Sequence, residues 1–336
     1  ATGHAENIAN AKYVGRDKCV ACHKDQEQDW LGSDHHLAMQ EATPQTVLGD
    51  FDNAEFTHRD LTTRFFKKDG NFFVETEGPT GIRDTFQIKY TFGVRPLQQY
   101  MVEFPDGRVQ CLTVAWDVER DRWFTLYPDE RTPHYDWLHW TKGGQNWNYM
   151  CAECHSTDVK KNYRLNSDSY HTTFFEINVS CEACHGPGSE HVKWANLDDP
   201  NEHAIDLDAG LTVQMKGIEN ARAQVEVCAR CHSRRRVVHD EYVPGKPFLD
   251  HYAPELLQET LYHADGQILD EVYVYGSFIQ SKMYHKNVRC TDCHDPHKAT
   301  LIAQGNALCV RCHKPEQFDV YEHHRHPAES KGTQCV

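Results

Sequence analysis

Residues 60–126 alternate between hydrophobic and polar positions in short runs. The runs include DTFQIKYTFG and VEFPDGRVQCLTVAW, are rich in Phe, Tyr, Val and Thr, and are separated by KDGN, GPTG and PDG. Alternation with a period of two is typical of strands with one buried face, and breaks containing Gly or Asn are typical of hairpin turns. The pattern predicts an antiparallel β insert of five or six strands over about residues 60–126.

Periodicity is weaker outside this insert. The sequence NARAQVEVCARCHSRRR, which starts at residue 220, predicts a helix. Residues 254–285 predict a helix or loop, a short hairpin with Asp265 and Gly266 at its turn, and another helix. We therefore divide the chain into an N-terminal segment at 1–54, a β-rich insert at 55–130 and a long segment at 131–336.

The composition indicates that the protein needs an additional source of hydrophobic core. Only 39% of the 336 residues are hydrophobic, whereas 14 are Cys and 23 are His, both far above ordinary usage. The net charge of -15 excludes a basic nucleic-acid footprint, since SRRRVV at 233–238 is a single short basic run. No stretch reaches the ~20 apolar residues of a membrane span.

The cysteines supply the candidate chemistry. Six C-x-x-C pairs occur, and His follows each of them at once, which is the attachment signal of c-type haem. We number these motifs 1 to 6 in chain order. Their attachment cysteines are Cys19, Cys22, Cys151, Cys154, Cys181, Cys184, Cys228, Cys231, Cys290, Cys293, Cys309 and Cys312. Their proximal iron ligands are His23, His155, His185, His232, His294 and His313. The sequence therefore predicts six covalently attached haem c groups.

Motifs 5 and 6 also have the spacing of a four-cysteine zinc ribbon. A zinc ribbon needs no His after each pair, so two haem sites explain this stretch better. Two cysteines remain. Cys111 lies in an alternating run and is expected to be a buried hydrophobic residue. Cys335, in GTQCV, is expected to begin a seventh motif in a longer chain, with a free thiol as the alternative.

Six further ligands are needed if every iron is six-coordinate and low-spin. The sequence context selects a group of distal candidates: His35, His139, His191, His251, His297 and His324. Alternatives remain open, because His36 adjoins His35, and His323 and His326 flank His324. His285 is a reserve, and His4 is a candidate ligand for a haem of a neighbouring subunit. The number of histidines outside the motifs does not show that every iron has a sixth ligand.

The expected fold class is a mostly α and irregular multihaem cytochrome c fold with a haem-dominated core and an antiparallel β insert. Motif 1 lies in the segment 1–54, and the other five motifs lie in the segment 131–336. Haems stacked on haems would form the core of this part. Hydrophobic periodicity is therefore a weak guide to its structure.

The sequence around the motifs resembles that of a known group of proteins. YVGRDKCVACH, GSDHHLAMQ, NWNYMCAECHST, INVSCEACHGPGSEHV and CTDCHDPH are similar to bacterial tetratricopeptide-associated multihaem cytochromes of the hydroxylamine oxidoreductase and pentahaem nitrite reductase superfamily. The resemblance covers nearly the whole chain. It implies close haem pairs, export from the cytoplasm, a seventh motif at Cys335, and distal ligation by His35, His191, His297 and one histidine of HHRH. The resemblance also implies His139 and His251 as candidate distal ligands. No motif ends in Lys, so the active-haem signature of the nitrite reductases is absent.

Electron transfer along closely spaced, mostly bis-His haems, in respiratory or extracellular electron transfer, is the leading expectation, with redox proteins as partners. One alternative is an oxidoreductase acting on a small nitrogen or sulfur oxyanion at a five-coordinate haem, with Arg234, Arg235, Lys282 and Tyr284 as candidate anion-binding groups. Another is a subunit of an extracellular cytochrome filament, which needs a heterologous, non-closing contact. The chain starts at Ala1 without Met, which fits a mature exported protein of the periplasm or cell surface.

Overall fold

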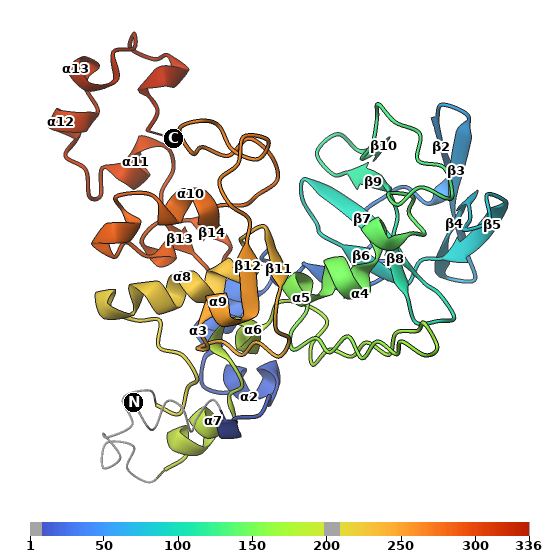
Figure 1. The fold of residues 1–336 in the computed structure, drawn as a ribbon, viewed down its shortest axis with the longest axis horizontal. Coiled ribbons are helices and arrows are strands. Elements are labelled where there is room, and N and C mark those ends of the chain that lie inside the picture. The colour runs from blue at the N-terminus through green and yellow to red at the C-terminus, as the bar shows by residue number, and fades with distance from the viewer. Residues whose placement is uncertain (1–8, 198–208, 336) are drawn as a thin grey trace. The chain divides into compact units, whose positions relative to one another are not determined.

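The computed structural model describes residues 9–197 and 209–335. The chain forms two compact units, unit 1 at Ala1–Thr212 and unit 2 at Val213–Val336 (Figure 1). His4, the candidate ligand for a neighbouring subunit, lies outside the described residues. Within the described ranges, no helix is both long enough and apolar enough to cross a membrane.

The described part of unit 1 contains ten strands in two antiparallel sheets. The six-stranded sheet has the order β1-β6-β7-β9-β10, with β8 also paired to β7, and the four-stranded sheet has the order β2-β3-β4-β5. The strands are β1 (Met39–Glu41), β2 (Asp52–His58), β3 (Leu61–Lys68), β4 (Asn71–Glu77), β5 (Arg83–Gln87), β6 (Tyr90–Phe92), β7 (Leu97–Glu103), β8 (Val109–Cys111), β9 (Val114–Asp117) and β10 (Arg122–Thr125).

The β-rich insert is confirmed, but it is larger than predicted. It begins at Met39 instead of residue 60, and it has ten strands instead of five or six. The sequence pattern missed β1 because three residues are too few to show alternation. It missed β2 because the register shifts between Asp52 and Ala54, where Asn53 has a positive φ of 59°. A bulge of this kind breaks the two-residue period.

Aromatic side chains form the core of this region. In β4, Phe72, Val74 and Thr76 are buried, while the residues between them are only half-buried, as a two-sided strand requires. Phe51 lies at the centre of the cluster, because its ring meets those of Phe65, Phe72, Tyr100 and Trp123 edge-on at 5.1–5.6 Å. The rings of Phe65 and Trp123 stack with centroids 3.5 Å apart.

The helices of unit 1 are short. They are α2 (Arg16–Val20), α3 (Lys24–Trp30), the 3-10 helix η1 (Gly143–Gln145), α4 (Trp147–Met150), α5 (Ala152–His155), α6 (Cys181–His185) and α7 (Ser189–Ala195). Five of them, α2 to α6, carry or directly adjoin motifs 1 to 3. Most helices described in this region are thus short turns built around the motifs.

Unit 2 has one longer helix and many short ones. Its helices are η2 (Ile218–Asn220), α8 (Ala221–Ala229), α9 (Phe248–His251), α10 (Tyr275–Ile279), η3 (Tyr284–Lys286), η4 (Cys290–Asp292), α11 (Asn306–Cys309), α12 (Pro315–Phe318), α13 (Tyr321–His324) and η5 (Lys331–Thr333). Its strands form two antiparallel pairs, β11 (Arg235–Val237) with β12 (Tyr252–Pro254), and β13 (His294–Asp295) with β14 (Thr300–Leu301).

Two sequence predictions for unit 2 are confirmed, the first of them in part. The helix predicted from residue 220 is confirmed over Ala221–Ala229, where α8 carries the first cysteine of motif 4, but its predicted second half is wrong, because Arg235–Val237 form β11. The turn at Asp265 and Gly266 closes a hairpin in which the His263 amide donates to the Gln267 carbonyl at 2.9 Å. Gly266 has a φ of +85°, which favours glycine at this turn.

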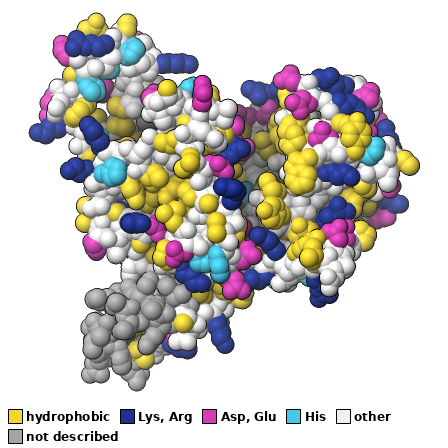
Figure 2. All heavy atoms as spheres, viewed as in Figure 1, with side chains coloured by type: hydrophobic (Ala, Val, Ile, Leu, Met, Phe, Trp, Pro, Cys, Tyr) yellow, Lys and Arg dark blue, Asp and Glu magenta, His cyan; other side chains and the backbone are white. Residues whose placement is uncertain are grey.

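Burial within unit 2 stops well before its end. Small clusters form around Phe248 and Tyr252 and around Leu261, Tyr262 and Val272. Among the described residues after Val272, no side chain is buried. Hydrophobic side chains remain at the molecular surface (Figure 2), and those of the residues after Val272 include Val274, Met283, Leu301 and Tyr321.

Candidate haem sites

Each motif folds as one helical turn. The amide of the second cysteine donates to the carbonyl of the first in motifs 1, 2, 4, 5 and 6, at 3.1–3.2 Å. In motifs 1, 4 and 6 the histidine amide also donates to that carbonyl, and motif 3 lies entirely within α6. This turn gathers two thiols and an imidazole within five residues. None of these eighteen side chains belongs to a buried residue, so the residues present fit a haem c group at each motif.

Motifs 1 and 3 contact each other through their first cysteines. The thiols of Cys19 and Cys181 are hydrogen-bonded, which raises the pKa of Cys19 and lowers that of Cys181. Helix α2, which carries Cys19, packs against α6, which begins at Cys181. The two attachment points of different haems thus lie side by side within unit 1.

Motifs 4 and 5 repeat this arrangement within unit 2. A hydrogen bond from Cys228 lowers the pKa of Cys290, and α8 packs against η4. The Gln224 side chain accepts hydrogen bonds from the amide and the hydroxyl of Thr291, both at 3.1 Å. The first cysteines of motifs 4 and 5 are therefore neighbours, as are those of motifs 1 and 3.

The first cysteine of motif 6 has a similar neighbour. Partial desolvation, followed by the nearby Cys309 thiol, raises the pKa of Cys335. The Cys335 amide donates to Asn306 Oδ1 at 2.9 Å, and Asn306 Nδ2 donates to the Thr333 carbonyl at the same distance. The first cysteines of motifs 5 and 6 therefore have different neighbours, Cys228 for Cys290 and Cys335 for Cys309. Such neighbours do not resemble the four-cysteine cluster of a zinc ribbon.

Motif 2 is built on the β-rich region instead. Cys151 packs with Cys111, Met101 and Trp147 in a second core cluster, and burial raises the pKa of Cys151 to about 12. Cys111 is buried, as the sequence predicts.

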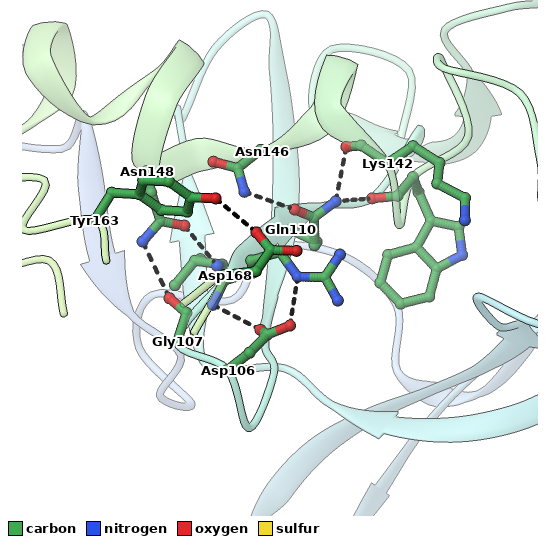
Figure 3. A network of polar contacts seen from close by, with 11 residues as sticks. Asp106, Gly107, Gln110, Lys142, Asn146, Asn148, Tyr163 and Asp168 are labelled. Carbon is green, nitrogen blue, oxygen red and sulfur yellow. Dashed lines mark hydrogen bonds and ion pairs between the residues drawn. The ribbon is translucent and has the colours of Figure 1, made fainter. Parts of the chain in front are cut away.

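A polar network holds the helix before motif 2 in place (Figure 3). Gln110 Nε2 donates to the carbonyls of Trp140 and Lys142, both at 2.9 Å. Asn148 Nδ2 donates to the Gly107 carbonyl at 3.1 Å, and Asn148 Oδ1 accepts from the Val109 amide at 2.7 Å. Helix α4 is thereby fastened to β8, and it positions Cys151 directly after it.

A buried carboxylate inside motif 3 was not found by sequence reasoning. Glu182 is 1% exposed, and burial raises its pKa. It accepts hydrogen bonds from the amides of Val14, Gly15 and Gly188 at 2.7–3.1 Å. The two middle positions of C-x-x-C-H carry no signal of their own, so only the folded contacts reveal that Glu182 fastens the segment before motif 1 to motif 3.

Two distal candidates have a ring nitrogen hydrogen-bonded to a backbone carbonyl, which suits an iron ligand. His191 Nδ1 lies 2.7 Å from the Ala209 carbonyl, and His251 Nδ1 lies 3.0 Å from the His239 carbonyl. A carbonyl can only accept, so Nδ1 carries the proton in each ring and Nε2 keeps its lone pair for a metal. Both rings are thereby oriented for ligation.

Two others have the opposite arrangement. The Gly32 amide donates to His36 Nδ1 at 2.9 Å, and the His326 amide donates to His324 Nδ1 at 3.0 Å. In these neutral rings Nε2 carries the proton and cannot bind iron without losing this bond. This geometry favours His35 over His36 and places His324 at a disadvantage to His323. The ring of His323 contacts Phe318, as does that of His313, the predicted proximal ligand of motif 6.

His139 follows the β-rich region in the sequence and packs against Glu77 of β4. Its ring is buried, with Nδ1 2.9 Å from Thr141 Oγ1 and Nε2 3.7 Å from Glu77 Oε1. Burial lowers its pKa to about 4. Neither Nε2 nor Glu77 Oε1 has a hydrogen-bond partner among the described residues.

The contacts described for the candidate anion-binding residues are with different neighbours. Arg234 pairs with Asp270 at 3.3 Å, and the Arg235 guanidinium lies 3.9 Å from the centre of the Tyr252 ring. Tyr284 contacts Phe278 and His285. Lys282 is exposed.

His297 is the distal candidate that follows motif 5. Its backbone amide donates to Asp295 Oδ1 at 3.1 Å.

Comparison with known proteins agrees with these motifs. The family described as cytochrome c554 and c-prime matches residues 130–186, and the doubled CXXCH motif family matches residues 285–318. These ranges include motifs 2 and 3 and motifs 5 and 6. Comparison with curated protein sequences found no match.

A solved structure shares the fold. The crystal structure of outer cell wall cytochrome OcwA is similar at a TM-score of 0.61 and 19% sequence identity, over 92% of this chain and 68% of that chain. Six motifs, two matching families and this fold together identify a multihaem c-type cytochrome. The sequence around the motifs also implies membership of the hydroxylamine oxidoreductase and pentahaem nitrite reductase superfamily. This membership stays a prediction.

Proposed function

We propose that the protein moves electrons between redox partners along six covalently attached haems. The observation that carries this proposal is the packing of the motif helices in pairs, α2 with α6 in unit 1 and α8 with η4 in unit 2, which brings Cys19 near Cys181 and Cys228 near Cys290. Each thioether lies at the edge of its porphyrin. Two porphyrins whose attachment points touch are therefore close at their edges, and electron transfer is fast only across such short gaps.

The proposal includes bis-His ligation, which avoids gain or loss of a ligand during each redox step and leaves the potentials to be set by surroundings and burial. The proposed distal ligands are His35, His191, His251 and His297. His323 takes the place of His324 because of the ring hydrogen bonds described above. His139 is the sixth expected ligand, but we propose that it has a structural role, because its ring nitrogens face Thr141 and Glu77. We propose that the reserve candidate His285 completes the set of six.

The proposed setting is outside the cytoplasm, at the periplasm or cell surface. The printed name of the similar structure, an outer cell wall cytochrome, supports it. The net charge of -15 would steer the encounter with basic partner surfaces. The arrangement near Cys335 would also suit a seventh attachment site, and a filament remains an alternative mode of assembly.

The test is low-temperature EPR of the fully oxidised protein, after intact mass has fixed the haem count. We expect the mass of six haems and only low-spin ferric signals. Addition of nitrite, hydroxylamine or sulfite should leave these signals unchanged. A high-spin signal of one haem per chain that shifts with any of these anions would overturn the proposal in favour of an oxidoreductase.

A further inference from the structure

We propose that His191 is the sixth ligand of the haem attached at motif 1, opposite His23. This assignment rests on the proposed electron-transfer function, and it names one iron for a residue that the sequence offers only as a distal ligand. The segment from Cys181 to His191 would then serve two haems. His185 binds the iron of motif 3, and His191 reaches back to the iron of motif 1.

The distance between the two rings supports the pairing. The ring centroids of His23 and His191 lie 6.1 Å apart, and their planes differ by 27°. Two imidazoles that bind one metal from opposite sides have centroids roughly 6 Å apart, because each metal–nitrogen bond is about 2 Å and each centroid lies about 1 Å beyond its nitrogen. The observed separation leaves room for one iron between the rings.

The orientation of His191 agrees with this role. Its Nδ1 donates to the Ala209 carbonyl at 2.7 Å, so the Nε2 lone pair is available. Trp194, one turn further along α7, lies nearly parallel to the His191 ring at a centroid distance of 5.6 Å. The ring is therefore held by a backbone acceptor and bordered by an aromatic neighbour.

The backbone around His191 is fastened to the segment that precedes motif 1. The Lys12 amide donates to Ser189 Oγ at 2.9 Å, and the Ser189 amide donates to the Lys12 carbonyl at 3.1 Å. Glu182 adds the hydrogen bonds from Val14 and Gly15. These contacts fix α7 relative to α2, so the approach of His191 to His23 is built into unit 1.

The consequence is that the iron of motif 1 is closed to substrate. With imidazole on both faces, this haem can relay electrons, but it offers no open position at which an oxyanion could bind. Any catalytic iron in this protein would have to be another one.

The experiment uses H191A and H191M in the full haem-loaded chain. In H191A we expect a new high-spin ferric signal of one haem per chain, which added imidazole converts back to low-spin. In H191M we expect all haems to stay low-spin and one potential to rise, because Met/His ligation raises haem potentials. H36A is the matched control in the same unit, and it should show neither change.

A second background identifies the iron. In C19S/C22S the haem of motif 1 is not attached, and adding H191A should then produce no high-spin signal. If H191A gives a high-spin haem in this background as well, His191 binds another iron and the assignment is wrong. If H191A keeps every haem low-spin in the otherwise unchanged chain, the assignment is also wrong.

The outcome for the wild-type protein is separate. A high-spin haem that responds to anions there contradicts the electron-transfer proposal. A wild type with only low-spin haems, combined with a silent H191A, contradicts the assignment of His191 alone.

Discussion

The β-rich region at 39–125 and the segment at 273–335 show two ways of holding a chain together. The first surrounds Phe51 with four aromatic rings and buries side chains in both of its sheets. The second has no buried side chain among its described residues, and its helices have three to five residues each. Burial of one large apolar side chain contributes roughly 1.5–3 kcal/mol, and the second segment lacks this contribution.

This difference indicates where the second segment obtains its stability. Isolated helices shorter than about 12 residues have only marginal stability in water. The short turns of 273–335 are therefore not stable on their own. The segment carries motifs 5 and 6, with four attachment cysteines in about twenty residues. We infer that haems attached there supply the apolar surface that the side chains of the first region supply for themselves.

The largest expected effect comes from removing those attachments. The variant C290S/C293S/C309S/C312S should leave residues 273–335 unfolded, because the segment then loses its source of core. Pulsed hydrogen exchange measured by mass spectrometry should show rapid exchange over 273–335 and unchanged protection over 39–125. Equal protection of 273–335 in the variant and the wild type would contradict the inference.

The converse change is F51A. Removal of a fully enclosed aromatic ring should cost about 3–5 kcal/mol of the free energy of unfolding of the β-rich region. Urea unfolding followed by hydrogen exchange over 39–125 measures this loss. The EPR spectrum of the haems should remain low-spin, and L249A, at an exposed residue of unit 2, is the control with no loss expected. A small change in F51A would show that this core too depends on the haems.

The same contrast explains what could be predicted from the sequence. Side-chain alternation in β4 follows directly from one buried face, so the β-rich region was recognisable, although the bulge at Asn53 hid its beginning. The six motifs were recognisable because haem attachment needs a fixed local spacing.

The contacts between motifs were not predictable. The approach of Cys19 to Cys181 and of His23 to His191 joins residues far apart in the sequence, and no local pattern encodes it. The hydrogen bonds that separate His191 from His36 belong to backbone groups, which every residue has. A list of histidines can therefore name candidate ligands but cannot assign each one to an iron.

The smallest expected effect concerns His139, a buried histidine that packs against the β-rich region through Glu77 of β4. Because burial lowers its pKa to about 4 from an ordinary value near 6.5, the unfolded chain binds a proton more readily than the folded chain between these two pH values. This contribution to stability is complete above the unfolded pKa and falls as the pH drops towards 4. It should make the region about 2 kcal/mol less stable at pH 5 than at pH 7.

The variant H139Q should remove this part of the pH dependence, because glutamine does not titrate. Urea unfolding followed by circular dichroism at pH 7 and pH 5, in the wild type and in H139Q, measures the difference between the two slopes. The facing groups Glu77, Arg131, Lys142 and His134 are present in both proteins, so their own titration largely cancels. The EPR spectrum of H139Q should remain low-spin. If instead one haem becomes high-spin, His139 is an iron ligand, and the β-rich region is coupled to the haems through its own core.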